Sequence, residues 1–222
     1  FNKKIGKKKI ELIVGGPPCP TFSTIGHAKI KSIQSKKDSN FTLFDDKRNF
    51  LFNKYFDYIE HFKPNFFVME NVPNFVTKYN GSIFNQTKNK IEKLGYKIVN
   101  EKNFIFNAAD YGVPQTRKRM ILIGTKVKNF KYSLPKINFF SKDNILSQGS
   151  RYISVKEAIE DLPKITDNWR IDECKYSKYK NLTTYQKIMR KKTNGTVKNN
   201  ICRMTNDRAK KVFKEMKQGS KY

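Results

Sequence analysis

The first candidate for chemistry is Cys19, which follows closely on a short apolar segment. Residues 10–14 are mostly Ile, Leu and Val, which is typical of a buried strand, and two glycines and two prolines separate them from Cys19. The glycines permit close backbone approach and the prolines fix the turn, so we expect the thiol at the carboxyl end of the strand. Open α/β sheets place their chemistry at this edge. The alternative is that Cys19 is simply a small buried apolar residue.

The second candidate is a carboxylate, Glu70, that follows another apolar run. Residues 66–69 are predicted to form a buried strand that ends at Glu70 and Asn71. Between the two strands, residues 49–62 have large apolar side chains at helical spacing. Strand, helix and strand within about 60 residues form a βαβ unit, in which the two strands are parallel. We therefore expect Cys19 and Glu70 to converge at one edge of the sheet.

The third candidate is a pair of arginines at alternate positions, Arg117 and Arg119. Strands are expected at residues 96–106 and 119–125, so Arg117 lies between them and Arg119 begins the second one. In an extended chain alternate side chains share one face. Two guanidinium groups on one face are suited to binding a phosphate or a carboxylate. A helix is predicted before them at residues 82–94, with Gly95 as its left-handed end.

The charge of the chain favours a polyanionic partner. Forty-six Lys and Arg against 19 Asp and Glu give a formal net charge of +27 over 222 residues, which favours nucleic acid over an acidic membrane surface. Part of the lysine excess is assigned to codon bias, since the chain is also rich in Asn, Ile, Phe and Tyr. No apolar run approaches the roughly 20 residues of a membrane-spanning helix, and no signal peptide is recognised. We expect a cytoplasmic protein without a membrane partner.

Metal chemistry is not indicated by the cysteines. Cys19, Cys174 and Cys202 are far apart in the sequence and lack the short paired spacings of zinc sites.

Towards the carboxyl end, a helix is predicted at residues 154–162, where Ser154 and Glu157 form a capping box. The polar, lysine- and tyrosine-rich region that follows is expected to contact DNA, with a solvated surface as the alternative.

The three candidate segments resemble, in order and spacing, the motifs of the DNA (cytosine-5-)-methyltransferases. Residues 15–23 resemble the Pro-Cys nucleophile motif, residues 70–72 the Glu-Asn-Val motif and residues 115–119 the Gln-x-Arg-x-Arg motif. The resemblance extends from about residue 11 to residue 162. Supporting matches are Asp46, Arg48, Leu51, Leu94-Gly95-Tyr96 and Tyr111-Gly112-Val113-Pro114.

Two departures accompany the resemblance. Pro20 stands where the family usually has Gln, a side chain that is not a reacting group. The Phe-x-Gly-x-Gly turn and acidic strand end that hold S-adenosylmethionine, and the motifs that close the sheet, are not found. The resemblance therefore implies a partial Rossmann-like α/β S-adenosylmethionine-dependent methyltransferase fold. Its catalytic core is expected at residues 1–145, followed at 146–222 by a connector helix and the start of a target-recognition region.

The family chemistry implied is methyl transfer from S-adenosylmethionine to carbon 5 of a flipped-out cytosine. Cys19 would add to carbon 6, Glu70 would hold ring nitrogen 3, and Arg119 would bind the base carbonyl with Arg117 beside it. The other expected site residues surround these groups. Gln115 and Ser23 are expected to contact or position the substrate, Asn71 to brace the Cys19 turn in the substrate site, and Pro18 to border the methyl donor.

Three functions remain open from the sequence. The first is a DNA cytosine methyltransferase of a bacterial restriction-modification system, present as a partial chain or as one part of a split enzyme with a complementary chain. The second is an inactive relic that binds DNA through its charge. The third is an RNA cytosine methyltransferase of the same family, over which the basic carboxyl-terminal region favours double-stranded DNA. The recognised DNA sequence and the oligomeric state are not defined by the sequence.

Overall fold

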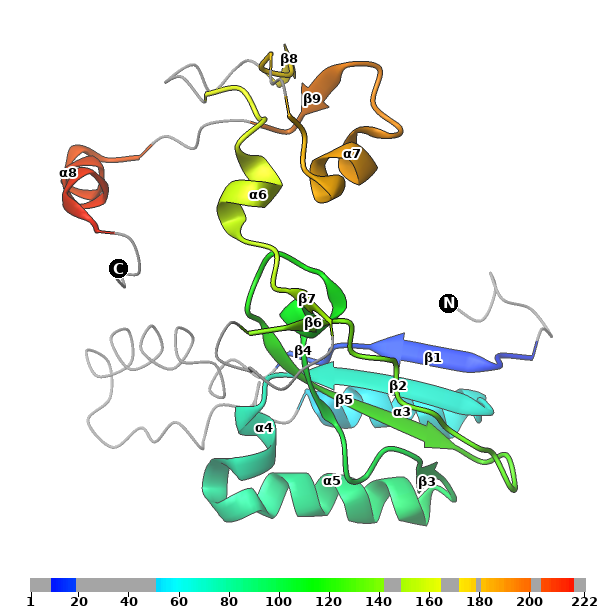
Figure 1. The fold of residues 1–222 in the computed structure, drawn as a ribbon. Helices are drawn as coiled ribbons and strands as arrows, with labels where there is room; N and C mark the ends of the chain where they lie inside the picture. Colours follow the sequence, from blue (N-terminus) through cyan, green and yellow to red (C-terminus); the bar gives the residue numbers. More distant parts are fainter. Residues whose placement is uncertain are drawn as a thin grey trace. The chain divides into compact units, whose positions relative to one another are not determined.

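The computed structural model describes residues 9–18, 51–141, 149–164, 172–178, 181–200 and 205–217. The chain divides into two compact units, residues 1–152 and 153–222, and each is described here by itself (Figure 1). The boundary that we predicted from the sequence lies after residue 145.

The first unit is built on a five-stranded sheet within the described residues. Its strands are β1 (Leu12–Gly15), β2 (Phe66–Asn71), β5 (Lys118–Thr125) and β3 (Lys97–Ile98) in spatial order, with β4 (Ile105–Asn107) also paired to β5. β1 and β2 are parallel, as the predicted βαβ unit requires, whereas β5 runs antiparallel to β2. The carboxyl ends of β1 and β2 and the amino end of β5 therefore meet at one edge of the sheet, here called the motif edge.

Helices cover one face of this sheet (Figure 1). The first is α3 (Phe52–Phe62), which precedes β2. The second is α5 (Ser82–Lys93), which follows β2 after the short α4 (Asn74–Thr77) and the 3₁₀ turn η4 (Lys78–Gly81). The fully buried side chains between helices and sheet include Phe56, Ile59, Phe67, Met69, Met120 and Leu122. Burial of each such side chain stabilises the fold by about 1.5–3 kcal/mol. The helical spacing seen in the sequence thus identified the core side of α3.

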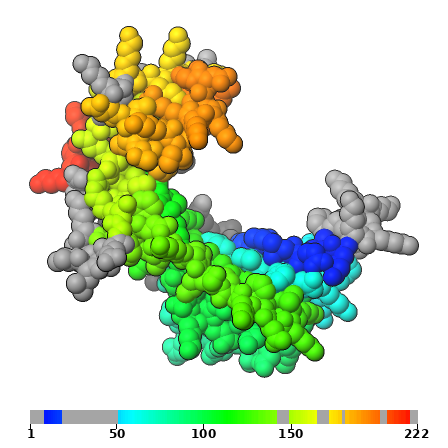
Figure 2. Space-filling view, turned by 45° about the vertical axis from the view of Figure 1, so that its right-hand side comes forward, coloured from blue at the N-terminus to red at the C-terminus, as the bar shows by residue number. Residues whose placement is uncertain are grey.

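The opposite face of the sheet is partly open in the described residues. Leu12 and Val14 of β1 alternate with the core side chains and are 50% and 66% exposed. Residues 9–18, in blue, lie at the surface in Figure 2. Val68, Ile121 and Ile123 share this face through the strand register and are half-buried. This face is apolar next to the motif edge, and it forms the floor of the site described below.

The prediction of one continuous strand over residues 96–106 is wrong for the middle of this range. The structure has two short strands, β3 and β4, separated by residues 99–104. Asn100 is buried in this break, where its amide donates to the Ile121 carbonyl at 2.7 Å and accepts from the Ile123 N–H at 3.1 Å. The Asn100 side chain thus supplies the hydrogen bonds that a neighbouring strand would otherwise make to β5. Hydrophobic alternation in the sequence does not reveal such a contact.

The second unit consists of short elements. They are α6 (Val155–Ile159), β8 (Glu173–Lys175), α7 (Thr184–Arg190), β9 (Thr196–Lys198) and α8 (Asp207–Glu215), with β8 and β9 paired antiparallel. The predicted capping box of Ser154 and Glu157 is confirmed at α6, and an unpredicted one begins α7 at Thr183. The buried Asp161 accepts from the Nε of Arg190 at 2.7 Å, which links the ends of α6 and α7.

No helix within the described residues is both long enough and apolar enough to cross a bilayer.

The buried hydroxyl of Tyr96 should make a contribution to stability that depends on pH. This hydroxyl donates to the Pro64 carbonyl at 2.7 Å, and burial raises the pKa of Tyr96 to about 12. Because this pKa lies above the unfolded value of about 10, the stabilisation is complete below pH ~10 and is lost as the pH rises towards 12. Tyr96→Phe should lower the free energy of unfolding by about 1 kcal/mol at pH 8. The difference should shrink above pH ~10.

Urea unfolding of both proteins between pH 8 and 11 measures this effect. Tyr185→Phe, in the second unit, is the matched control and should change the free energy of unfolding by less than about 0.5 kcal/mol. A wild-type advantage that stays constant across this pH range would contradict the prediction.

Candidate active site

Two glycines allow β1 to end against other chain segments at the motif edge. A Cβ at Gly15 would lie 2.7 Å from the Cε2 of Tyr55, and a Cβ at Gly16 would lie 2.9 Å from the Oε2 of Glu70. No side chain fits at either position without a shift in its neighbour. The backbone that leads to Cys19 therefore passes directly beside the Glu70 carboxylate.

Asn71 and Tyr55 hold the end of β1 in place. The Nδ2 of the buried Asn71 donates to the Pro17 carbonyl at 3.3 Å. The Tyr55 hydroxyl lies 2.8 Å from the Val68 carbonyl oxygen and 3.2 Å from that of Ile13. Burial raises the pKa of Tyr55, so this hydroxyl remains a donor. The polar role of Tyr55 was not predicted, because its helical spacing indicates only a core position.

Glu70 and Arg119 form an ion pair at the motif edge. The Arg119 Nε lies 2.7 Å from the Glu70 Oε1, and the Arg119 Nη1 also donates to the Lys118 carbonyl at 2.8 Å. The antiparallel register of β2 and β5 places Arg119 beyond the end of β2, within reach of Glu70. Both side chains are partly exposed, so the pair contributes little to stability and mainly orients the two groups.

Gln115 and Arg117 precede the start of β5. The Arg117 N–H donates to the Asn107 Oδ1 at 3.0 Å, and its side chain is exposed. Gln115 is exposed and its N–H donates to the Val113 carbonyl at 2.7 Å. Arg117 and Arg119 line the same cavity.

This cavity, of about 450 Å³, has a polar end and an apolar body. Glu70, Arg117 and Arg119 supply its charged groups. The other lining residues are Phe106, Ala108, Tyr111, Ile121, Ile123, Tyr132 and Pro135. Apolar walls with a few convergent polar groups are typical of small-molecule sites, and these walls suit a planar ring with hydrogen-bonding edges.

Of the three remaining predicted site residues, the structure describes only Pro18. Cys19 and Ser23 lie outside the described residues. Pro18, expected to border the methyl donor, is exposed directly before Cys19 in the chain. Within the described part of the chain, no group of three or more His, Cys, Asp or Glu could hold a metal ion.

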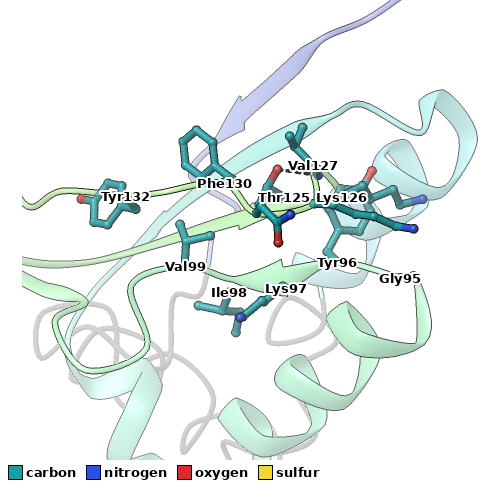
Figure 3. A pocket seen from close by; sticks show the side chains of 12 residues that line it. Gly95, Tyr96, Lys97, Ile98, Val99, Thr125, Lys126, Val127, Phe130 and Tyr132 are labelled. Carbon is teal, nitrogen blue, oxygen red and sulfur yellow. Dashed lines mark hydrogen bonds between the residues drawn. The ribbon is translucent and has the colours of Figure 1, made fainter.

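A second cavity lies at the other end of β5 (Figure 3). It has a volume of about 440 Å³, and Thr125, where β5 ends, accepts a hydrogen bond from the Val127 N–H at its wall. Its charged lining residues are Lys97, Lys126 and Lys128. The Lys126 Nζ lies 4.5 Å from the Tyr96 ring centroid. No predicted site residue lines this cavity, so the motif-edge cavity is the candidate active site.

Comparison with known proteins gives one family. The family model for C-5 cytosine-specific DNA methylases matches residues 1–222. The type II methyltransferase M.Bpa9945I of Bacillus paralicheniformis is 35% identical over 159 residues, which are 69% of this chain and 32% of that protein. The type II methyltransferase M.BspRI of Lysinibacillus sphaericus is 33% identical over 152 residues, which are 68% and 31%.

A solved structure supports the fold. It is described as a DNA modification methyltransferase encoded within an E. coli prophage, and it aligns with a TM-score of 0.55 at 27% identity over 84% of this chain and 46% of that one. The predicted α/β methyltransferase fold is confirmed. The chain spans about a third of the length of the two curated relatives and about half of this structure.

Substitution by alanine should lower the free energy of unfolding by different amounts at Gly15 and Gly16. Gly15→Ala should lower the free energy of unfolding by about 1–3 kcal/mol, because the new Cβ meets the ring of the packed Tyr55. Gly16→Ala should cost less than about 1 kcal/mol, because the end of the partly exposed Glu70 side chain can move aside. Urea unfolding of both variants measures the difference. Equal losses would mean that Glu70 is held as rigidly as Tyr55.

Proposed function

Because this chain belongs to the C-5 cytosine-specific DNA methylase family, we propose that it is the catalytic part of an enzyme that methylates carbon 5 of cytosine in double-stranded DNA. The observation that supports this most strongly is the meeting of Glu70, Arg119 and the turn before Cys19 at one sheet edge. S-adenosylmethionine is the methyl donor. The net charge of +27 provides phosphate contacts for the DNA.

The reaction begins with the Cys19 thiolate. Its sulfur forms a bond to carbon 6 of the cytosine, and the electron pair of the carbon 5–carbon 6 double bond becomes available at carbon 5. Carbon 5 would then take the methyl group of the bound donor, whose carbon–sulfur bond would break so that the sulfonium leaves as a neutral thioether. Loss of the proton from carbon 5 and cleavage of the sulfur–carbon bond restore the double bond. This last step frees the enzyme thiolate for another cycle.

Glu70 and Arg119 act on the polar edge of the base. The Glu70 carboxyl group, in its protonated form, donates a hydrogen bond to ring nitrogen 3 and stabilises the negative charge that enters the ring when the thiolate adds. Arg119 holds Glu70 through the 2.7 Å contact and binds the base carbonyl with its remaining N–H groups. Arg117 and Gln115 position the neighbouring substrate groups, and Asn71 keeps the turn that precedes Cys19 beside Glu70.

The size and lining of the cavity fit a base that has left the duplex. A stacked base does not expose both faces to a nucleophile and a donor, so the cytosine must flip into the protein. Phe106, Tyr111 and Tyr132 offer aromatic surface to an unstacked ring. The apolar lining also excludes water from the reacting carbon atoms.

The setting of the reaction follows from the relatives. The two relatives described above are type II methyltransferases, and on this basis we place the enzyme in a bacterial restriction-modification system of the cytoplasm. Pro18 borders the donor. The rest of the donor site is supplied by a part of the protein, or by a complementary chain, that corresponds to the unmatched length of the relatives.

Trapping with DNA that contains 5-fluorocytosine tests the function. Fluorine replaces the proton that must leave carbon 5, so the adduct accumulates. The protein of full natural length, with S-adenosylmethionine, should form a covalent complex that resists denaturation, and Cys19→Ala should abolish it. Salt-sensitive DNA binding by Cys19→Ala is the control for folding. DNA binding without an adduct in the wild type would instead support a non-catalytic DNA-binding protein, and an adduct only with RNA would support an RNA methyltransferase.

The two arginines should differ in importance. Arg119→Ala should slow adduct formation by about 100-fold, because it removes both the support of Glu70 and a donor to the base. Arg117→Ala should slow it less, since its side chain makes no ion pair in the described structure. Single-turnover rates with saturating DNA measure both. Equal losses, or a larger loss for Arg117→Ala, would reverse the assigned roles.

A further inference from the structure

A cluster of three polar side chains lies behind the arginine pair. The strand β4 ends at Asn107 and continues into the 3₁₀ turn η5 (Ala108–Tyr111). The Oδ1 of Asp110 accepts from the Tyr152 hydroxyl at 2.5 Å and from the Asn107 Nδ2 at 3.3 Å. The Asn107 Nδ2 also lies 3.3 Å from the Tyr152 hydroxyl oxygen. We call these three residues the Asn107 clasp.

The other end of the Asn107 amide holds the chain at Arg117. Its Oδ1 accepts from the Arg117 N–H at 3.0 Å and from the Ala109 N–H at 3.4 Å. Beside it, the Ala108 N–H donates to the Arg117 carbonyl at 3.0 Å. Both backbone polar groups of Arg117 are thus bound at the end of β4, two residues before Arg119.

Asp110 favours the observed orientation of the Asn107 amide, as do the two backbone N–H groups at its Oδ1. An asparagine side chain has a donor end and an acceptor end that exchange on rotation by about 180°. Asp110 offers an acceptor, so it pairs with the Nδ2 and leaves the Oδ1 for the Arg117 N–H. Without an acceptor at position 110, a rotated amide would place its donor end against the Arg117 N–H.

Tyr152 is itself held by the chain around it. The strand β6 (Phe139–Phe140) pairs in parallel with β7 (Ser150–Arg151), and the Tyr152 N–H donates to the Phe140 carbonyl at 2.9 Å. The Phe139 ring packs on Gly112, where a Cβ would lie 2.7 Å from the ring. The hydrogen bond to Asp110 raises the pKa of Tyr152, so the hydroxyl remains a donor at neutral pH.

We propose that Asp110 and Tyr152 are positioning residues for the arginine pair. They orient Asn107, which sets the path of the backbone at Arg117 and hence the direction from which Arg119 approaches Glu70. Neither residue contacts the base. Asp110 is needed as a hydrogen-bond acceptor and not as a charge. The assignment of a catalytic consequence rests on the proposed function, whereas the hydrogen-bond geometry does not.

Two substitutions at position 110 distinguish a role of Asp110 as hydrogen-bond acceptor from a role of its charge. Asp110→Asn retains an oxygen that accepts from Tyr152 and Asn107, and it should keep adduct formation within about threefold of the wild-type rate. Asp110→Leu retains similar bulk without an acceptor and should slow adduct formation at least about tenfold at saturating DNA, since small misplacements of a site group are costly. DNA affinity should remain unchanged in both.

Tyr152→Phe is the milder variant, because it removes one oxygen atom only. It should slow adduct formation less than Asp110→Leu, and Tyr185→Phe in the second unit is its matched control. Equal damage by Asp110→Asn and Asp110→Leu would overturn the acceptor role. A wild-type rate in both Asp110→Leu and Tyr152→Phe would overturn the positioning role.

Amide hydrogen exchange gives a measurement that does not depend on activity. The Arg117 N–H should exchange faster in Asp110→Leu and Tyr152→Phe than in the wild type, and Asp110→Asn should restore its protection. The Ile121 N–H, which donates to the Phe104 carbonyl at 2.8 Å, is the internal reference and should not change. If the wild type forms no adduct but this exchange pattern holds, the proposed function fails and the clasp geometry stands. Unchanged exchange at Arg117 would refute the clasp itself.

Discussion

The parallel pairing of β1 with β2 is the constraint on which the rest of the site depends. Gly15 lies opposite Met69, so the turn towards Cys19 and the Glu70 carboxylate leave the sheet at the same level. A slip of one residue would exchange the two faces of β1 and bury Val14 where Gly15 now meets Tyr55. The same pairing that buries the core therefore also brings the two motifs together.

The two faces of the sheet serve different purposes. One face is closed by α3 and α5, and its fully buried aromatic and aliphatic side chains stabilise the first unit. The other face remains partly open and apolar beside the motif edge, where the cavity lies. Because the Glu70–Arg119 pair is partly exposed, it adds little to folding free energy. The core thus holds in place a site that contributes little to the stability of the fold.

Asparagine side chains connect the backbone where the regular strand pairing stops. Asn71 binds the turn after β1, Asn100 binds β5 across the break between β3 and β4, and Asn107 binds the start of β5 at Arg117. An asparagine amide has a donor and an acceptor, like a peptide group, so it can replace a backbone partner. Such contacts allow the chain to bend near the site without leaving buried polar groups unpaired.

The sequence by itself determined the local elements and the motif residues. Spacing and end signals are short-range, so they predicted the core side of α3, the end of α5 at Gly95 and the capping box at Ser154. Only the tertiary structure decided the break at Asn100, the place of β5 between β2 and β3, and the contact of Arg119 with Glu70. These features depend on hydrogen bonds between residues far apart in the chain, which leave no periodic pattern in the sequence.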